Sequence, residues 1–294
     1  MTAPIAPEEI GIESAGRFPY FSDLALSARV AAVILAGFVM VAITGPLWAP
    51  YGPAAVLVGS PFAPPSMSHP FGTDDLGRDV FSRVIFGSRA ALITSVSASG
   101  LAVVLGTVAG LMLAYWRGWI DELGMRLIDI LMSVPPLILA LLLLSAGGSD
   151  SLLPILAVAI LFAPRVTRVV RAAALAIVTE DYVTAAVTRG ESALSIAWRE
   201  LLPNVAGTVF VEFSIRTGFA VVFIGALGFL GFGAAPPSPE WGLMIGEGRS
   251  SINASFWPVI APALSMAVLV ISVNLFTEGL ARLIGQSGRP SIRE

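Results

Sequence analysis

Residues 182–204, YVTAAVTRGESALSIAWRELLPN, form a charged and regularly patterned stretch within a chain that is otherwise largely apolar. The sequence suits a helix up to Arg189, and Gly190 then supplies a break because glycine reaches backbone angles closed to other residues. Ser192 can cap a second helix, which Pro203 should end. The stretch therefore predicts two short helices joined by a tight turn.

The second of these helices has one apolar side. Leu194, Ala197, Trp198 and Leu201 recur at helical spacing, while the charged residues face elsewhere. A short amphipathic helix of this kind can rest on lipid or fill a groove in a partner protein. A helix on a membrane surface is typically richer in basic residues and has a larger polar face. The pattern therefore favours a protein partner.

Composition places most of the chain in a lipid bilayer. Hydrophobic residues make up 56% of the sequence, charged residues 13%, and the mean hydropathy is +0.85. A helix needs about 20 mostly apolar residues to cross the hydrocarbon core. Five long charge-free stretches meet this requirement, and a sixth is weaker because Arg165 and Arg168 fall near its end. We expect an all-α polytopic membrane protein with six transmembrane helices, within residues 30–60, 90–116, 130–149, 152–170, 217–239 and 250–277.

An even number of spans places both termini on one side of the membrane, and arginine placement indicates which side. All 17 basic residues are arginines, and the face opposite the termini receives only Arg78, Arg83, Arg89 and Arg249, with Arg216 near a span. Cytoplasmic loops are enriched in arginine and lysine, so both termini are expected in the cytoplasm. The expected organisation is a cytosolic segment 1–27, a first span with an extracytoplasmic loop over 28–89, a core of five spans over 90–284 and a cytosolic tail 285–294.

Missing residue types exclude several classes of chemistry. Without cysteine there is no disulfide and no thiol catalysis, and His69 has no second histidine with which to bind a metal. Without lysine the chain cannot contain the phosphate-binding loop of nucleotide hydrolases, so a nucleotide that drives its work must bind another polypeptide. The net charge of −3 gives no argument for nucleic-acid binding. We expect no metal, no cofactor and no catalytic residues, and thus a chain that is not an enzyme.

Three local features are expected before the middle of the chain. Asp79 and Arg83 lie four residues apart and predict a solvated pair on an external amphipathic helix that precedes the second span. Gly106 and Gly110 allow another helix to approach the second span closely. Residues 117–124 then predict a short cytosolic turn.

Charges and a proline inside the spans give further expectations. Pro135 should kink the third span. Asp129 is expected to be neutralised by Arg126 at the membrane interface, the alternative being a place on the solute path. Glu212 and Arg216 lie four residues apart and should satisfy one another, the alternative being a role in a gate or in a contact with a partner.

Five stretches occur in the order found in one family. Four resemble the dipeptide, oligopeptide and nickel branch of ABC importer permeases: FGTDDLGRDVFSRV (71–84), RLIDILMSVPPLILA (126–140), LGFLGFGAAPPSPEWGLMI (227–245) and NLFTEGLARL (274–283). The fifth resembles the cytosolic coupling motif of these permeases, through Thr184, Ala185, Ala186, Gly190, Glu200, Leu201, Leu202 and Pro203. Thr184 departs from the family, which has glutamate there, and Glu200 stands where an apolar residue is frequent.

The resemblance implies a type I ABC importer permease fold in the inner membrane of a bacterial or archaeal cell, with a cytosolic coupling helix within residues 180–204. Two homologous permeases would form the pathway, two ATPase subunits would lie beneath them, and an extracytoplasmic solute-binding protein would deliver the solute. Gly190 would set the turn of the coupling segment, Ala185 and Ala186 would permit close approach, and Pro203 would fix the exit. The groove on the ATPase would receive Leu194, Trp198 and Leu201, and Leu202 would belong to the coupling motif beside them.

The family pattern leaves the solute open. Peptides are the commonest implication, and nickel complexes or oligosaccharides are the alternatives within the same role. A secondary transporter would show an inverted repeat, broken helices at the membrane midplane or several buried ionisable groups, and none is evident beyond Asp129 and the pair formed by Glu212 and Arg216. A membrane enzyme would need a cluster of catalytic groups, which one histidine without cysteine or lysine does not provide.

Overall fold

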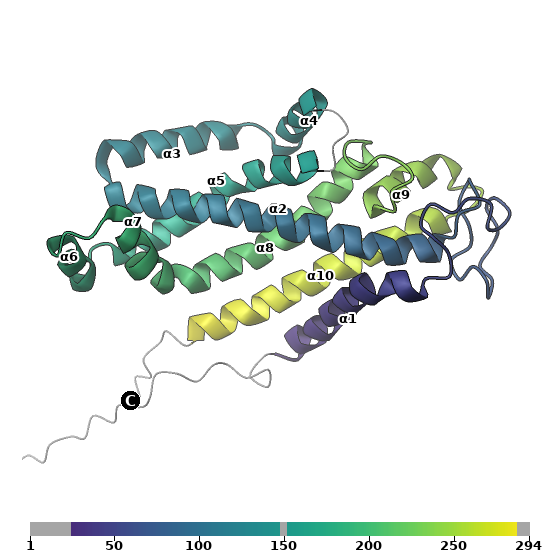
Figure 1. Ribbon diagram of the computed structural model, residues 1–294, viewed down its shortest axis with the longest axis horizontal. Helices are drawn as coiled ribbons and strands as arrows, with labels where there is room; N and C mark the ends of the chain where they lie inside the picture. Colours follow the sequence, from purple (N-terminus) through teal and green to yellow (C-terminus); the bar gives the residue numbers. More distant parts are fainter. Residues whose placement is uncertain (1–24, 148–151, 287–294) are drawn as a thin grey trace, which may run out of the picture.

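The computed structural model describes residues 25–147 and 152–286, so most of the expected terminal segments 1–27 and 285–294 lies outside the described residues. Within these ranges every named element is a helix, and the long helices lie side by side in an elongated bundle (Figure 1). Five of them are long and apolar enough to cross a membrane, and a bent helix pair can supply a sixth crossing. The expected all-α polytopic architecture is confirmed. The five long helices are α1 (Leu26–Trp48), α2 (Val80–Trp116), α5 (Leu152–Ile177), α8 (Leu202–Phe229) and α10 (Trp257–Gln286).

The bent pair consists of α3 (Gly118–Ser133) and α4 (Pro136–Gly147), whose axes meet at 86°. Val134 between them is extended, with φ −82° and ψ 132°. A residue before proline is pushed out of the helical region by the proline ring, which accounts for the break ahead of Pro135. The kink expected at Pro135 is therefore present, and it is sharp enough to divide the third span into two helices.

The second span begins earlier than the sequence predicted. The helix expected before residue 90 is present from Val80 onward, but it is not divided from the second span, because α2 is one continuous helix of 37 residues. The expected turn over residues 117–124 is wrong, because only Arg117 and Gly118 turn, with φ of 50° and 59°. Two consecutive left-handed residues reverse the chain in little space, and α3 starts at once.

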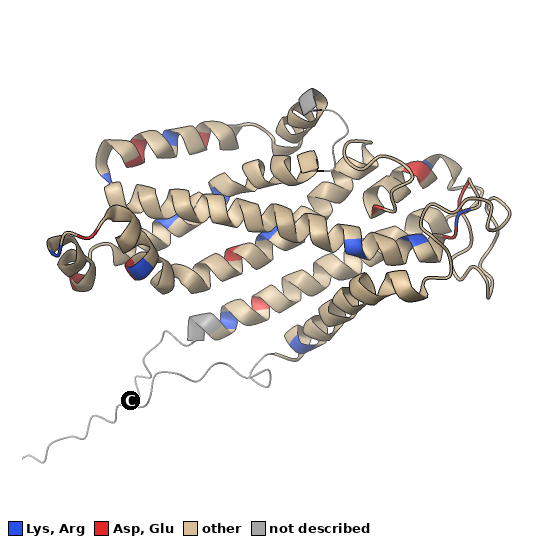
Figure 2. Cartoon of the chain, in the orientation of Figure 1, with Lys and Arg blue, Asp and Glu red and all other residues tan. Residues whose placement is uncertain are grey.

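Short elements lie at the two ends of the bundle (Figure 1). One end, which we call the coupling end, carries α6 (Asp181–Thr188), α7 (Ala193–Ile196) and a π-helical turn η2 (Ala197–Leu201). The opposite or distal end carries α9 (Trp241–Gly248) and the 3-10 turn η3 (Arg249–Ser251). Charged residues gather toward these ends, while a few lie along α2, α5 and α8 (Figure 2). This distribution leaves long apolar stretches between the ends, as a bilayer requires.

Small residues allow α2 to pack directly on α5. A Cβ atom added at Gly106 would lie 2.5 Å from Cβ of Val166, and one added at Gly110 would lie 2.9 Å from the carbonyl oxygen of Thr167. These distances leave no space for a side chain, so the close approach expected from the two glycines is confirmed. Without a hydrophobic force between helices in lipid, such backbone contact is a main source of association.

A valine in place of Gly106 should force α2 and α5 apart. Its side chain would meet both Val166 and the carbonyl oxygen of Ala163, 2.8 Å from the added Cβ. Overpacking of this kind costs about 1–3 kcal/mol, which should appear as a lower Tm of the detergent-solubilised protein. Gly37→Val is the matched control, because no atom lies within 4 Å of a Cβ added at this glycine of α1. Equal Tm values for the two variants would contradict the packing argument.

Candidate functional site

The coupling segment, residues 180–204, contains the tight turn that the sequence predicted. After α6 ends at Thr188, N–H of Arg189 donates to the carbonyl of Ala185 at 3.0 Å, and N–H of Gly190 donates to that of Val187 at 2.9 Å. Gly190 has φ +79°, and a Cβ atom added there would meet nothing within 4 Å. Glycine is thus needed for the backbone conformation and not for space.

The residues after the turn fix the start of the second helix. Ser192 caps α7 by accepting a hydrogen bond from N–H of Ser195 at 3.3 Å, as expected. Glu191 accepts from Ser195 Oγ at 3.0 Å and from Arg189 Nη2 at 2.7 Å. The hydrogen bond from Arg189, followed by that from Ser195, holds the pKa of Glu191 below its ordinary value. The ionised carboxylate of Glu191 therefore links Arg189, before the turn at Gly190, to Ser195 after it.

One side of the coupling segment is built into the core of the bundle. Ala186 and Val183 of α6 are buried, as are Ile196, Ala197 and Leu201 after the turn. They belong to one apolar cluster with residues of α2 and α5, among them Leu111, Ala114, Val170 and Ala174. The sequence motif did not single out Val183 or Ile196. For Val183 the available signal was its spacing of three residues from Ala186, which places both on one side of a helix. Ile196 lies five residues before Leu201, so no helical spacing rule linked it to the motif.

The other side of the segment is open to its surroundings. Leu194 is 58% exposed and Trp198 is 51% exposed, whereas Ala197 and Leu201 are almost completely buried. The prediction that these four residues make one outward stripe is wrong. Residues 197 and 198 differ by one position, which is roughly 100° around a helix, so Ala197 and Leu201 face the core while Leu194 and Trp198 face out. The coupling motif also divides, because Ala185 is exposed and Ala186 is buried.

The helix that follows the turn does not end at Pro203. The π turn η2 leads directly into α8, N–H of Leu202 donates to the carbonyl of Ala197, and residues 193–229 form one helical span. The expected helix end at Pro203 is therefore wrong. The proline falls in the first turn of α8, and the wider π turn before it relaxes the usual ladder of hydrogen bonds, so its missing N–H is tolerated. Leu202 is half-buried and Pro203 is exposed at this junction.

Two ion pairs involve the charged residues expected within the spans. Glu212 and Arg216 are both buried in α8, and Arg216 Nε donates to Glu212 Oε2 at 2.9 Å, so their mutual satisfaction is confirmed. Asp129 does not pair with Arg126. Its partner is Arg168 of α5, while Arg126 pairs with Glu122 one turn earlier in α3. Packing of α3 against α5 brings Arg168 to Asp129, which no local spacing could indicate.

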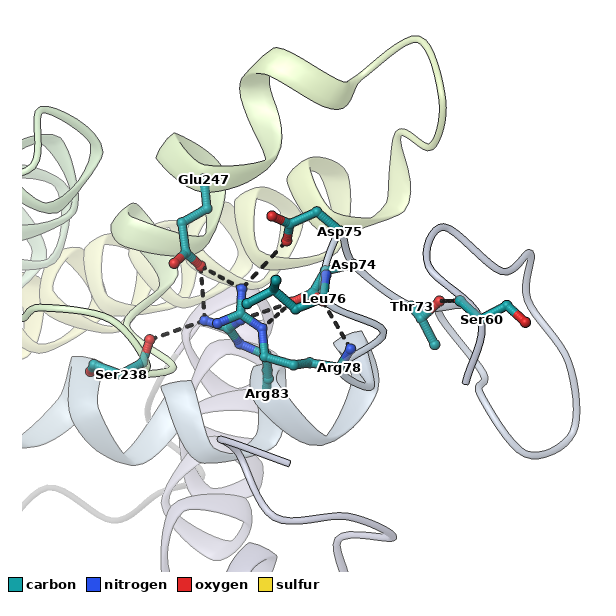
Figure 3. A network of polar contacts seen from close by, with 9 residues as sticks. All are labelled: Ser60, Thr73, Asp74, Asp75, Leu76, Arg78, Arg83, Ser238 and Glu247. Carbon is teal, nitrogen blue, oxygen red and sulfur yellow. Dashed lines mark hydrogen bonds and ion pairs between the residues drawn. The ribbon is translucent and has the colours of Figure 1, made fainter. Parts of the chain in front are cut away.

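At the distal end, buried charges join the loop before α2 to α9 (Figure 3). Arg78 and Arg83 both contact Asp74, Arg83 through Nη1 at 2.8 Å, and both reach Glu247 Oε2 of α9 at 3.1 Å. Arg83 Nη2 also donates to the carbonyl of Ser238 at 3.1 Å. The two guanidinium groups are almost fully buried. This network, Asp74, Arg78, Arg83 and Glu247, is called the distal network below.

The distal network replaces the solvated pair that was expected between Asp79 and Arg83. Asp79 is instead the N-cap of α2, where Oδ2 accepts from N–H of Ser82 at 2.8 Å, and Oδ1 lies 3.0 Å from His69 Nδ1. Among residues 25–147 and 152–286, no group of three or more acidic or histidine side chains could hold a metal ion. No sequence motif pointed to Glu247. A glutamate between glycines in an apolar stretch, without a local partner, was the available signal.

Glu240 is a buried carboxylate at the start of α9, and its burial predicts a pH dependence of stability. Its two oxygens accept hydrogen bonds from N–H of Gly242 and Leu243 at 2.9 and 2.8 Å, yet desolvation is stronger and raises its pKa. A carboxyl whose pKa is raised by folding favours the folded state most at low pH, and this contribution is lost as pH rises through the folded pKa.

We therefore expect Glu240→Gln to gain stability relative to the natural chain as pH rises from 4 to 8. Thermal unfolding of both proteins across this range measures the difference in Tm. Glu122→Gln, at an exposed position of α3, serves as the control. A Tm difference for Glu240→Gln that stays constant with pH would contradict the expectation.

Comparison with known proteins places this architecture in one family. The sequence pattern of the binding-protein-dependent transport system inner membrane component matches residues 102–286, more than half of the chain. A dipeptide transport system permease protein of Alkalihalophilus pseudofirmus is 34% identical over 253 residues, which cover 86% of this chain and 83% of that protein. A glutathione transport system permease protein of Pectobacterium atrosepticum is 36% identical over 216 residues, or 74% and 72% of the two chains.

A third relative, a putative peptide transport system permease protein of Brucella suis, is 34% identical over 255 residues and covers 86% of each chain. The family match over residues 102–286 includes the coupling segment and the helices from α3 to α10, but only the C-terminal part of α2 and none of α1. Identity at this level, over most of both chains, extends well beyond a shared short motif. The chain therefore belongs to the family of binding-protein-dependent transport system inner membrane components, the permease subunits of ABC importers.

Proposed function

We propose that the chain forms half of the translocation pathway of an ATP-driven importer of peptides, with a second, homologous permease as the other half. The named relatives transport dipeptides, glutathione and peptides, which supports peptides as the solute class. Two ATPase subunits hydrolyse ATP, and an extracytoplasmic binding protein delivers the solute at the distal end. The chain itself binds no nucleotide and catalyses no reaction.

The observation that carries this proposal is the two-sided coupling segment. Its inner side is part of the core that α2 and α5 share, whereas Leu194 and Trp198 project outward from the end of the bundle. An exposed tryptophan and leucine on a firmly anchored element are typical of a protein contact. A force applied to these side chains would pass directly into two long helices and into α8.

The proposed topology follows from the same arrangement. Residues 1–27, the coupling segment and residues 285–294 lie in the cytoplasm, and the loop between α1 and α2 lies outside the inner membrane. The chain has no cysteine, so a single introduced cysteine can show on which side of the membrane its position lies, without labelling of other residues. A cysteine at Met67, fully exposed in the loop, should react with impermeant reagents from outside, and one at Leu194 only after the membrane is opened. The reverse labelling pattern would overturn this topology.

Purification of the tagged chain from its native membrane in mild detergent tests the proposal. A second permease and ATPase subunits should accompany the natural chain, and Gly190→Pro should lose the ATPases because proline cannot adopt a φ of +79°. Gly231→Pro is the matched control at the distal end: Gly231 has φ +84°, its N–H donates to an i−3 carbonyl as that of Gly190 does, and a Cβ there meets nothing within 4 Å.

Each result of this purification has a definite meaning. Loss of the ATPases from Gly190→Pro alone supports coupling through the segment. A chain that is recovered without any ATPase, in every sample, would contradict the importer function and favour a secondary transporter. Uptake of labelled dipeptides, longer peptides, nickel chelates and oligosaccharides by the reconstituted complex then tests the solute, and uptake of only a non-peptide would overturn the peptide assignment.

A further inference from the structure

Arg89 is an exposed cation on a membrane-spanning helix. Within the described part of the chain its guanidinium group forms no ion pair, unlike those of Arg78, Arg83, Arg168 and Arg216. The position is eight residues after Phe81, or about 12 Å further along α2 at about 1.5 Å per residue. A cation at such a depth is costly unless it meets an anion or water.

The level of the membrane surface is marked by an aromatic contact. Phe81 packs against Trp48, which ends α1, with ring centroids 6.4 Å apart. Tryptophan is enriched at the boundary between lipid and water. The backbone of Arg89 therefore lies inside the bilayer relative to this boundary, on the distal side of its midplane. Helical side chains lean toward the N-terminus of their helix, which for α2 is the distal end, so the Arg89 side chain leans toward the boundary.

An apolar groove begins beside Arg89 and runs away from the boundary. It lies between α1 and α2 and has a volume of about 560 Å³. Three residues of α1 form one wall, Val39, Ala42 and Ile43. The other wall continues beyond Arg89 through Leu92, Ile93 and Val96 and ends at Ser97. Ile43 is 71% exposed and Ile93 is 53% exposed, so the groove is not filled by the chain itself. The Arg89 cation thus lies at the end of the apolar groove that is nearest the boundary.

We propose that this groove is a binding site for an anionic phospholipid of the leaflet at the distal end. Its phosphate accepts hydrogen bonds from the Arg89 guanidinium, and one acyl chain lies along Leu92, Ile93 and Val96. A phospholipid has an anionic headgroup at the boundary and hydrocarbon chains beneath it. The groove has the Arg89 cation at the boundary and apolar side chains beneath it, so the two match. The planar guanidinium also binds phosphate oxygens in pairs, which a single point charge does not.

Charge complementarity favours an anionic over a zwitterionic lipid. The phosphate of a zwitterionic headgroup already has a cation in the same molecule, whereas that of phosphatidylglycerol does not. A protein chain in the groove would have to supply both a carboxylate at the level of Arg89 and an apolar segment below it. The site is separate from the coupling segment and from the distal network, so its occupancy does not rest on the identity of the solute.

The test is lipid retention by the chain purified in mild detergent with whatever subunits accompany it. The sample is exchanged into phosphatidylglycerol or phosphatidylcholine, and bound lipid is counted by native mass spectrometry during stepwise delipidation. We expect the natural chain to retain one phosphatidylglycerol molecule that phosphatidylcholine does not replace. Arg89→Gln should weaken this retention about tenfold, in line with the loss of a charge-assisted hydrogen bond, and Ile93→Trp should prevent it by filling the groove.

Two further variants keep the result interpretable. Arg249→Gln removes another arginine of the distal end, one that lies over the ring of Phe229, and should leave retention unchanged. Arg89→Lys keeps the charge and should preserve the preference for phosphatidylglycerol. Equal retention by Arg89→Gln and the natural chain would overturn the proposal. High-yield cross-linking of a cysteine at Arg89 to a second polypeptide would also overturn it, because a protein would then occupy the groove.

Discussion

Replacing Trp198 by aspartate should lower the affinity of the chain for the ATPase subunits by about 30-fold or more. The tryptophan ring projects from the coupling segment, 51% exposed, beside Leu194. Buried tryptophans at the centre of a protein contact contribute about 2 kcal/mol or more, and a carboxylate in the same groove adds a desolvation cost. Titration of detergent-solubilised permease with ATPase subunits measures the affinity, and ATP-driven peptide uptake should fall in parallel.

Trp116→Asp is the matched control for this prediction. Trp116 is also 51% exposed and lies at the coupling end, on the last turn of α2, outside the coupling segment. Its replacement should leave the ATPase affinity close to that of the natural chain. If the two variants lose affinity equally, the exposed face of the coupling segment is not the contact. If neither loses affinity, the ATPases attach elsewhere on the chain.

Replacing Arg83 by methionine should destabilise the protein by about 3 kcal/mol, near the lower end of the range for breaking a buried ion pair. The methionine side chain fills similar space but leaves Asp74 and Glu247 with Arg78 as their remaining arginine. It also removes the hydrogen bond to the carbonyl of Ser238. The loss should therefore be smaller than that of the double variant in which Arg78 is replaced as well.

Thermal unfolding of the detergent-solubilised variants measures this effect, with Arg249→Met as the control at an exposed distal position. The double variant should lose more than Arg83→Met alone. Arg78 also lies 3.6 Å from a carboxylate oxygen of Asp75, so without both arginines Asp74, Asp75 and Glu247 lose their cations. A Tm of Arg83→Met equal to that of the control would contradict a structural role for the distal network. Stabilisation by the double variant would show that burial of these charges costs more than their pairing contributes.

Sequence patterns predicted the long helices and the turn because both depend on residues close together in the chain. The charge-free stretches located the spans, and Gly190 with Ser192 located a local backbone conformation that each residue type favours by itself. The side of a short helix that faces the core is different, because it depends on which neighbours the tertiary fold supplies. α2 and α5 cover Ala197 and Leu201 and leave Leu194 and Trp198 exposed.

Charge pairing shows the same limit. Glu212 and Arg216 were correctly paired because both lie on one helix, four residues apart. Asp129 and Arg83 were each assigned a partner on the same helix. Asp129 instead pairs with Arg168, 39 residues away in the sequence, and Arg83 pairs with Asp74, nine residues away, and with Glu247, 164 residues away. A spacing rule can rank neighbours on one helix, but it carries no information about a second helix that packs alongside.

The unbroken passage from η2 into α8 gives the molecule a mechanical property. Residues 193–229 form a single rod that runs from the coupling end to the distal end, and 37 residues at about 1.5 Å each give it a length of roughly 55 Å. A tilt of about 5° at one end of a rod that long sweeps the other through an arc of roughly 5 Å. Displacements the size of one helical turn near α9 thus require only a small angular change at the opposite end.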